Sequence, residues 1–107
     1  MAAASLAGRT AVAGRQAPRA WIDEFARAFC SRDAAYVSAH VSGELDIGEG
    51  RIADAFARRA WDCSSSRYLG SASNTDGQHH VFVLTGSDDE EQWVVFTVAD
   101  EKVVGID

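Results

Sequence analysis

The chain has 107 residues, of which 47% are hydrophobic and 24% charged, and its formal net charge is −6. A chain of this length and composition suits a single globular domain that can bury an apolar core without staples. An acidic domain repels phosphate backbones, so nucleic acid is not an expected partner. The sequence has no apolar run near the roughly 20 residues that span a bilayer, so no membrane span is expected.

Residues 1–18 differ in composition from the rest of the chain. They hold many small residues, two arginines and no acidic residue. Their apolar stretch is too short and too rich in alanine for the hydrophobic part of a signal peptide. We interpret them as a flexible leader or linker, with an organelle transit peptide as the alternative, and expect the folded domain at residues 19–107. A cytoplasmic location is expected, although such a leader leaves export or tethering open.

Three helices are predicted in the first part of the domain. Apolar residues at helical spacing follow the only proline and predict a helix over about 18–31. Asp33 has the character of an N-cap and predicts a short helix over about 33–41. Two glycines in residues 44–50 indicate a short extended segment and a turn. A second amphipathic pattern predicts a helix over about 50–62.

Four strands are predicted after these helices. Residues 64–73 form a weak strand pattern, residues 78–85 and 92–99 form strong ones, and residues 102–106 form the last. Turn residues and a run of four acids separate them, and such short connections imply antiparallel neighbours. The predicted fold class is therefore α+β, with three N-terminal helices packed on a four-stranded antiparallel meander.

The two strong strands are apolar on both faces. Val81 and Val83 point one way and Phe82 the other, and residues 92–99 repeat this pattern. A single layer of helices covers only one face, and a sheet face that met water would show polar residues in alternation. We therefore predict that a second copy of the chain covers the outer face, in a homodimer.

The chain has two cysteines, Cys30 and Cys63, and no CxxC spacing. Two cysteines are too few for a cysteine-only zinc site. We interpret them as small buried hydrophobic residues, whereas a disulfide between them would imply an oxidising compartment. The sequence has no HExxH, P-loop or GxGxxG motif, so no metal and no cofactor is predicted. The acidic run 88–91 lacks the ligand spacing of a calcium loop.

Three segments carry a resemblance to a known family. FARAFCSRDAAYVSAHV, residues 25–41, is an aromatic helix that reaches a polar break at an aspartate before a second short helix. GRIADAF, residues 50–56, is a helix led by glycine, and QWVVFTVADEKVVGID, residues 92–107, is an aromatic-rich closing hairpin. Residues 19–107 thus resemble the nuclear transport factor 2-like, or SnoaL-like, superfamily. The resemblance implies a cystatin-like cone, in which a curved sheet wraps around the first helix, with an apolar pocket and dimerisation through the sheet.

In isomerase-type members of that superfamily, a carboxylate is the base and a tyrosine on the first helix donates to the oxyanion. The tyrosine position falls near Phe25, which has no hydroxyl, and the base position falls near Asp46 to Glu49. His79 and His80 are neighbours on a strand, so they face opposite sides, and one of them could assist as acid or base. The candidate catalytic residues are Asp46, Glu49 and His80, and the simpler interpretation of both carboxylates is solvated loop acids.

We expect a non-catalytic domain that dimerises and binds a small apolar ligand. The alternative is a small isomerase, dehydratase or cyclase in which a pocket carboxylate is the general base. A set of aromatic residues could line the pocket, although a core needs the same side chains. The candidate pocket residues are Trp21, Phe25, Phe29, Tyr36, Phe56, Trp61, Phe82 and Phe96.

Overall fold

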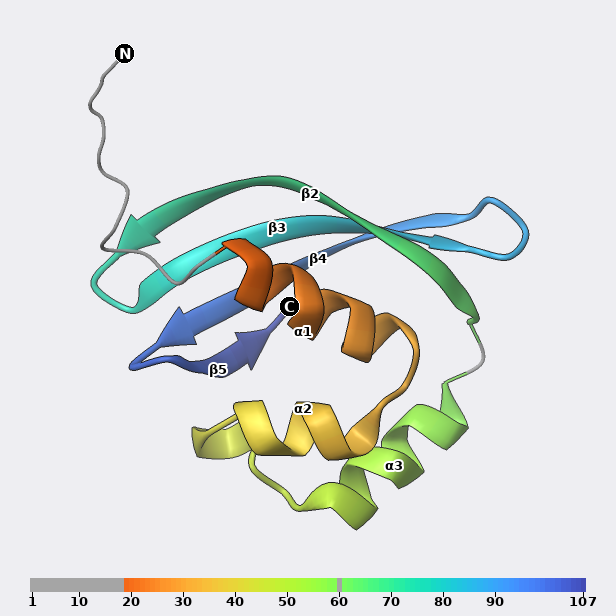
Figure 1. The fold of residues 1–107 in the computed structure, drawn as a ribbon, viewed down its shortest axis with the longest axis horizontal. Helices are drawn as coiled ribbons and strands as arrows, with labels where there is room; N and C mark the ends of the chain where they lie inside the picture. The colour runs from red at the N-terminus through yellow and green to blue at the C-terminus, as the bar shows by residue number, and fades with distance from the viewer. Residues whose placement is uncertain (1–18, 60) are drawn as a thin grey trace.

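The computed structural model describes residues 19–59 and 61–107, in which helices come first and strands follow (Figure 1). The helical elements are α1 (Arg19–Cys30), α2 (Ala34–His40), the 3₁₀ helix η1 (Gly43–Leu45) and α3 (Glu49–Arg58). The strands are β2 (Cys63–Asn74), β3 (Gly77–Gly86), β4 (Glu91–Ala99) and β5 (Lys102–Ile106). The predicted α+β class, with three helices and a four-stranded antiparallel sheet, is confirmed. The expectations for residues 1–18 lie outside the described residues.

Local capping sets the bounds of α2. The side chain of Asp33 accepts a hydrogen bond of 3.1 Å from the backbone N–H of Tyr36, which confirms the predicted N-cap. His40 lies in the last turn, where Nδ1 of its ring is 2.8 Å from the carbonyl oxygen of Tyr36. Side chains at both termini of α2 thus form hydrogen bonds with backbone groups of the helix.

The segment expected to be extended, residues 44–50, is instead helical and turned. Gly43–Leu45 forms η1, and α3 begins soon afterwards. Gly48 has a φ of 95°, a left-handed value that glycine adopts without steric cost, so the chain turns sharply before α3. Extended backbone that pairs with the sheet occurs just before this segment, where Val41 forms a parallel bridge with Val103 of β5.

Helix α3 is shorter than its predicted range of 50–62. It ends before Arg59, whose backbone is extended with a φ of −74° and a ψ of 119°. The guanidinium carbon of Arg59 lies 5.2 Å from the ring centroid of Phe29 and 5.3 Å from that of Phe56. These cation–π contacts hold the chain against the core where the helix stops. Trp61, expected on the apolar face of this helix, therefore lies beyond its end.

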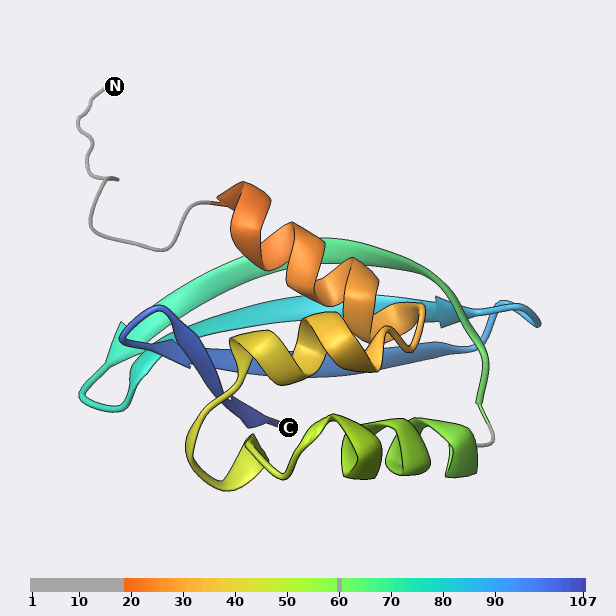
Figure 2. The ribbon, with the colours of Figure 1, turned by 60° about the horizontal axis from the view of Figure 1, so that its bottom comes forward.

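The four strands form one sheet in the order β2-β3-β4-β5. β2 is 12 residues long, although its sequence pattern is weak. Bulges interrupt its pairing with β3 between Cys63 and Ser65 and between Tyr68 and Gly70. Because bulges bend a strand and increase its twist, they contribute to the curvature of the sheet over the helices (Figure 2). None of the helices in the described ranges is long and apolar enough to cross a membrane.

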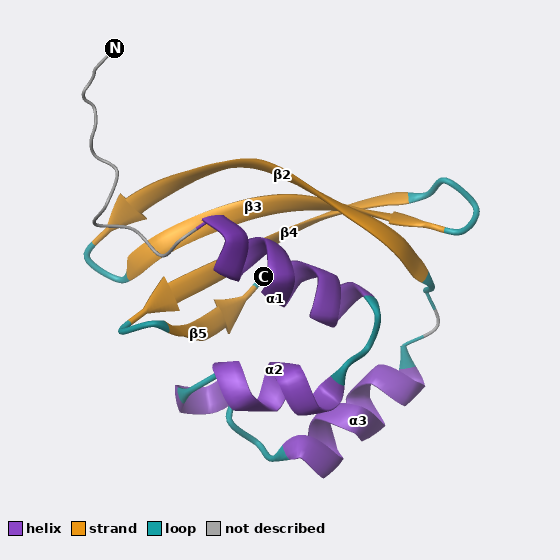
Figure 3. Cartoon of the chain, viewed as in Figure 1, coloured by secondary structure: helices purple, strands orange, loops and turns teal. Residues whose placement is uncertain are grey.

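The helices form one layer against the inner face of the sheet (Figure 3). Phe25 of α1 and Phe96 of β4 are fully buried, and their rings meet edge to face with centroids 5.2 Å apart. Phe82 of β3 lies 5.6 Å from Phe96 and is 1% exposed. The core therefore lies between α1 and the two central strands, and the outer face of the sheet carries no helix from the described residues.

The two cysteines form a disulfide, which corrects the interpretation of each as a separate small hydrophobic residue. Cys30 ends α1 and Cys63 begins β2, with Cα atoms 5.1 Å apart. Their separation of 33 residues includes all of α2 and α3. The disulfide therefore fastens the C-terminal end of α1 to the first residue of the sheet.

Candidate functional site

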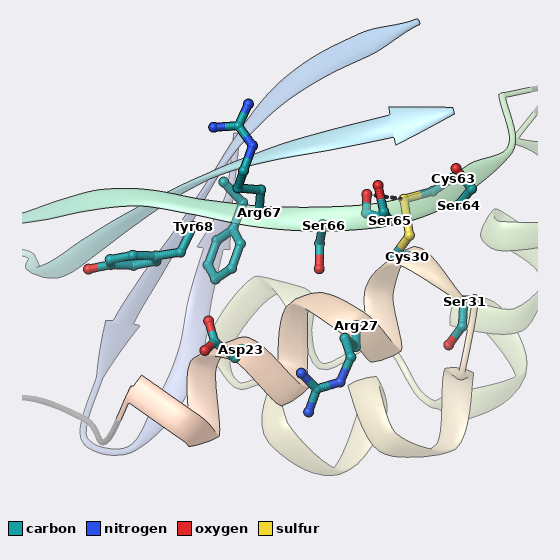
Figure 4. A pocket seen from close by; sticks show the side chains of 11 residues that line it. Asp23, Arg27, Cys30, Ser31, Cys63, Ser64, Ser65, Ser66, Arg67 and Tyr68 are labelled. Atoms are coloured by element: carbon teal, nitrogen blue, oxygen red, sulfur yellow. Dashed lines mark hydrogen bonds between the residues drawn. A yellow bond between two sulfur atoms is a disulfide. The ribbon is translucent and has the colours of Figure 1, made fainter. Parts of the chain in front are cut away.

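A groove of about 760 Å³ lies between α1 and β2 (Figure 4). Tyr68 and the almost fully buried Phe82 give it an apolar floor, and the disulfide lies at its other end. Along β2 the groove is lined by the consecutive residues 63–68. Since neighbouring side chains of a strand point to opposite faces, contact with consecutive residues means that the groove follows the edge of the strand.

Helix α1 supplies the opposite wall of the groove. Asp23 and Arg27 lie one helical turn apart on this wall. Figure 4 shows the hydroxyl of Ser66 pointing from β2 toward α1, whereas Arg67 points away on the other side of the strand. Within the described part of the chain, the side chains of Arg27 and Arg67 make no hydrogen bond and no ion pair. The groove therefore combines an apolar floor with one acidic and two basic side chains, those of Asp23, Arg27 and Arg67.

The candidate catalytic residues lie in different surroundings. Asp46 follows η1 and Glu49 begins α3, and both are exposed. His80 is 2% exposed on the inner side of β3, where its ring centroid lies 6.1 Å from that of Tyr68. None of these three candidates is among the residues that line the α1–β2 groove. The two carboxylates thus lack the apolar enclosure that the general-base hypothesis requires.

The strand register determines which of the two neighbouring histidines faces the helices. His80 pairs with Phe96 and is buried on the inner face. His79 pairs with Thr97 on the outer face, and its Nδ1 lies 2.9 Å from Thr97 Oγ1. Its Nε2 lies 2.8 Å from Asn74 Oδ1, an acceptor, so this nitrogen donates. The sequence left this choice open because a shift of one residue in register exchanges the two faces.

The aromatic residues named as pocket candidates pack mainly against one another. The ring centroid of Phe96 lies 5.4 Å from that of Phe29, which in turn lies 5.7 Å from that of Phe56. Phe82 belongs to the same cluster and also lines the groove. Trp61 lines a smaller, acidic pocket of about 400 Å³ beside the β3–β4 hairpin. In residues 19–59 and 61–107, no three potential metal ligands lie close enough together to hold an ion.

Two further aromatic candidates, Trp21 and Tyr36, surround His40. The ring of Tyr36 stacks on that of His40 at 4.1 Å, and Trp21 meets the same ring edge-on at 5.8 Å. Burial raises the pKa of Tyr36, and the negative charge of Glu24 raises it further, whereas Arg27 opposes the change. The burial of Tyr36 and the nearby charge of Glu24 therefore favour the neutral form of its phenol.

The raised pKa of Tyr36 predicts an alkaline stability effect. In the unfolded chain Tyr36 ionises at its ordinary value of 10.0, whereas in the folded chain it ionises at higher pH. The stability due to this difference is complete below the unfolded pKa and is lost as pH rises through the folded pKa. We expect Tyr36→Phe to lose less unfolding free energy than the wild type when urea denaturation is compared at about pH 9 and about pH 11. Parallel losses in the two proteins would contradict this assignment.

Sequence reasoning missed the residues that form the groove. Asp23 and Arg27 lie in the helix predicted over 18–31, and Ser66 and Arg67 lie in the weakest strand pattern. The groove forms only because α1 and β2 lie side by side, and no local pattern encodes that contact. No protein-family model, curated protein or solved structure matches this chain, so the resemblance noted above stays a prediction.

Proposed function

We propose that this chain is a non-catalytic interaction domain that forms a homodimer through the outer face of its sheet. The observation that carries the proposal is Trp93 of β4, which is 70% exposed. It pairs with Val83, and the next pair on the same face is Val81 with Val95. A large aromatic side chain exposed among valines is typical of an interaction surface rather than of a solvated sheet.

The composition of the outer face supports this assembly. On this face the two central strands present one charged side chain, that of Glu91, which pairs with Thr85 beside the hairpin. Protein interfaces commonly have an apolar centre that is poor in charge and rich in aromatic residues, with a polar rim. A two-fold axis would place this patch against its own copy, so one surface serves both partners. The central residues are His79, Val81, Val83, Thr85, Trp93, Val95 and Thr97.

The isomerase-type alternative has weaker support. The position at which such enzymes place a tyrosine corresponds to Phe25, which lies fully buried among other rings. Without that hydroxyl, the hydrogen bond to the developing oxyanion is missing, and this interaction is usually the largest contribution to the rate. The exposure of Asp46 and Glu49 further favours an interaction role.

Two finer proposals accompany the dimer. The position of α1 within the curve of the sheet supports the cystatin-like cone that the family resemblance implies (Figure 2). The disulfide between Cys30 and Cys63 supports a place of action in an oxidising compartment, since cytosolic thiols are normally kept reduced. This second proposal replaces the cytoplasmic location expected from the sequence.

Trp93→Glu should convert the dimer to a monomer. Loss of a central tryptophan typically costs about 2 kcal/mol or more of binding energy, and a buried glutamate adds a desolvation cost. Light scattering coupled to size exclusion at micromolar concentration should give the wild type twice the chain mass of 11.5 kDa and the variant that mass once. The matched control is Ile47→Glu, because Ile47 is 44% exposed but lies before α3, away from the sheet face. A monomeric wild type, or equal dissociation in both variants, would contradict the proposal.

A further inference from the structure

The outer face of the sheet carries charges of opposite sign at its two edges. On β2, Arg67 pairs with Val83 and therefore faces outward with it, and Figure 4 shows its side chain pointing away from α1. After β5, Asp107 exchanges backbone hydrogen bonds of 3.1 and 3.0 Å with Val95, so its side chain faces outward as well. We propose that Arg67 of each copy binds Asp107 of the other copy in the dimer proposed above, on which this inference rests.

Both side chains are available to a second chain. Arg67 and Asp107 are exposed, and within residues 19–59 and 61–107 neither side chain makes a hydrogen bond or an ion pair. The two residues lie on opposite edges of the sheet, three strand spacings or roughly 14 Å apart, so they do not pair within one copy. A second copy can supply to each of them the opposite charge that its own chain keeps at the far edge.

The direction of the two-fold axis decides which edges meet. An axis parallel to the strands, placed between the two central strands of the facing sheets, lays β2 of one copy over β5 of the other and does so twice. An axis across the strands would instead lay β2 over β2 and β5 over β5. It would gather both arginines at one edge and both aspartates at the other, and like charges disfavour such a contact. The charges therefore favour the axis along the strands.

The strand register brings the two side chains to similar levels along this axis. Asp107 pairs with Val95, and Val95 pairs with Val81. On its other side, Val81 pairs with Gly70 of β2, so Asp107 of one copy comes over a residue without a side chain in the other. Arg67 lies at the next outward-facing position of β2, roughly 7 Å further along. The long arginine side chain can cover this offset between sheets that pack about 10 Å apart.

The other charges near the outer face do not favour a different axis. The strands end in acidic residues at the β3–β4 hairpin, residues 88–91, and in Asp76 and Asp100 at the opposite end. Either axis brings acidic ends together, so repulsion between the ends does not distinguish the two arrangements. On β5, Nζ of Lys102 donates to the carbonyl oxygen of Ala39 of α2 at 2.8 Å, so this charge is directed toward the helices. The opposite charges of the two edges thus decide the orientation.

Charge reversal tests the pair in the full chain. Arg67→Glu and Asp107→Arg each place like charges at both contacts of the dimer. Each variant should therefore weaken the dimer about tenfold or more, measured as the dissociation constant by sedimentation equilibrium. An equimolar mixture of the two variants allows a mixed dimer in which both contacts again join opposite charges. We expect the mixture to dimerise with a dissociation constant within about threefold of the wild-type value.

Two control variants on α3 match these changes in net charge. Arg58→Glu and Asp54→Arg reverse exposed side chains on a helix that lies on the other side of the sheet. They should leave the dissociation constant unchanged, alone and in an equimolar mixture. Arg67 and Asp107 are exposed, so their variants should unfold at the same urea concentration as the wild type.

The outcomes separate this inference from the dimer itself. A monomeric wild type would contradict both. A dimer that Trp93→Glu dissociates but neither reversal at Arg67 nor at Asp107 weakens would leave the outer-face dimer standing and overturn the ion pair. Weakening by both reversals without recovery in their mixture would also overturn it. Preferential pairing of Arg67→Glu with the wild type would bring the two β2 edges together, with the axis across the strands, and would likewise overturn the proposal.

Discussion

Replacing both cysteines, Cys30→Ala with Cys63→Ala, should lower the free energy of unfolding by roughly 4 kcal/mol, given that the disulfide joins residues 33 apart. The crosslink removes conformations from the unfolded chain, and the removed entropy grows with the length of the closed loop. A domain of this size is typically stable by about 5–15 kcal/mol, so the double variant should be close to marginal. Urea denaturation of both proteins at equal concentration provides the measurement.

The double variant should still fold, because the disulfide is not the only contact at the junction of α1 and β2. The disulfide joins α1 to β2, and Arg32 holds the same junction by donating to the carbonyl oxygens of Arg59 at 2.9 Å and Trp61 at 3.0 Å. These hydrogen bonds remain when both cysteines are replaced, so the fold should persist at low temperature. Reducing agent should destabilise the wild type by a similar amount and leave the double variant unchanged. A double variant within about 1 kcal/mol of the wild type would contradict a stabilising role for the disulfide.

Periodicity predicted the secondary structure well where burial is one-sided or complete. The helix expected over residues 18–31 is observed at 19–30, and the strand expected over 92–99 is observed at 91–99. In these segments the apolar residues repeat with the period of the element, so the pattern itself carries the information. The helix expected over 50–62 was too long because Trp61 continues the apolar pattern of the helix, whereas α3 ends at Arg58 and the backbone of Arg59 is extended.

The disulfide and the groove could not be predicted by the same reasoning. Both depend on the contact between α1 and β2, which are separated by the whole of α2 and α3. β2 begins with Cys63 and a run of serines, and an edge strand with one side open to solvent needs no strict alternation. Arg27 of α1 and Arg67 of β2 line the same groove only because these two elements lie beside each other.

Phe96→Ala should lower the free energy of unfolding by about 3–5 kcal/mol. Phe96 is fully buried, and its ring lies 5.2 Å from Phe25, 5.4 Å from Phe29 and 5.6 Å from Phe82 between centroids. Truncation removes the ring at which residues from α1, β3 and β4 meet, and the cavity left behind adds to the lost transfer free energy. Phe96→Leu keeps most of the volume and should cost less than half as much in urea denaturation. Equal losses for leucine and alanine would contradict this packing role.

Variants at Phe96 and Trp93 distinguish the stability of the fold from dimerisation, because these residues lie on opposite faces of the same strand. Phe96→Ala should lower stability while the folded fraction still dimerises, since it leaves the outer face unchanged. Trp93→Glu should abolish the dimer while the fold persists, since a residue that is 70% exposed contributes little to the core. Unfolding of the wild type should then depend on protein concentration, whereas unfolding of Trp93→Glu should not. A concentration-independent wild type would show that the outer face of the sheet makes no stable contact with its own copy.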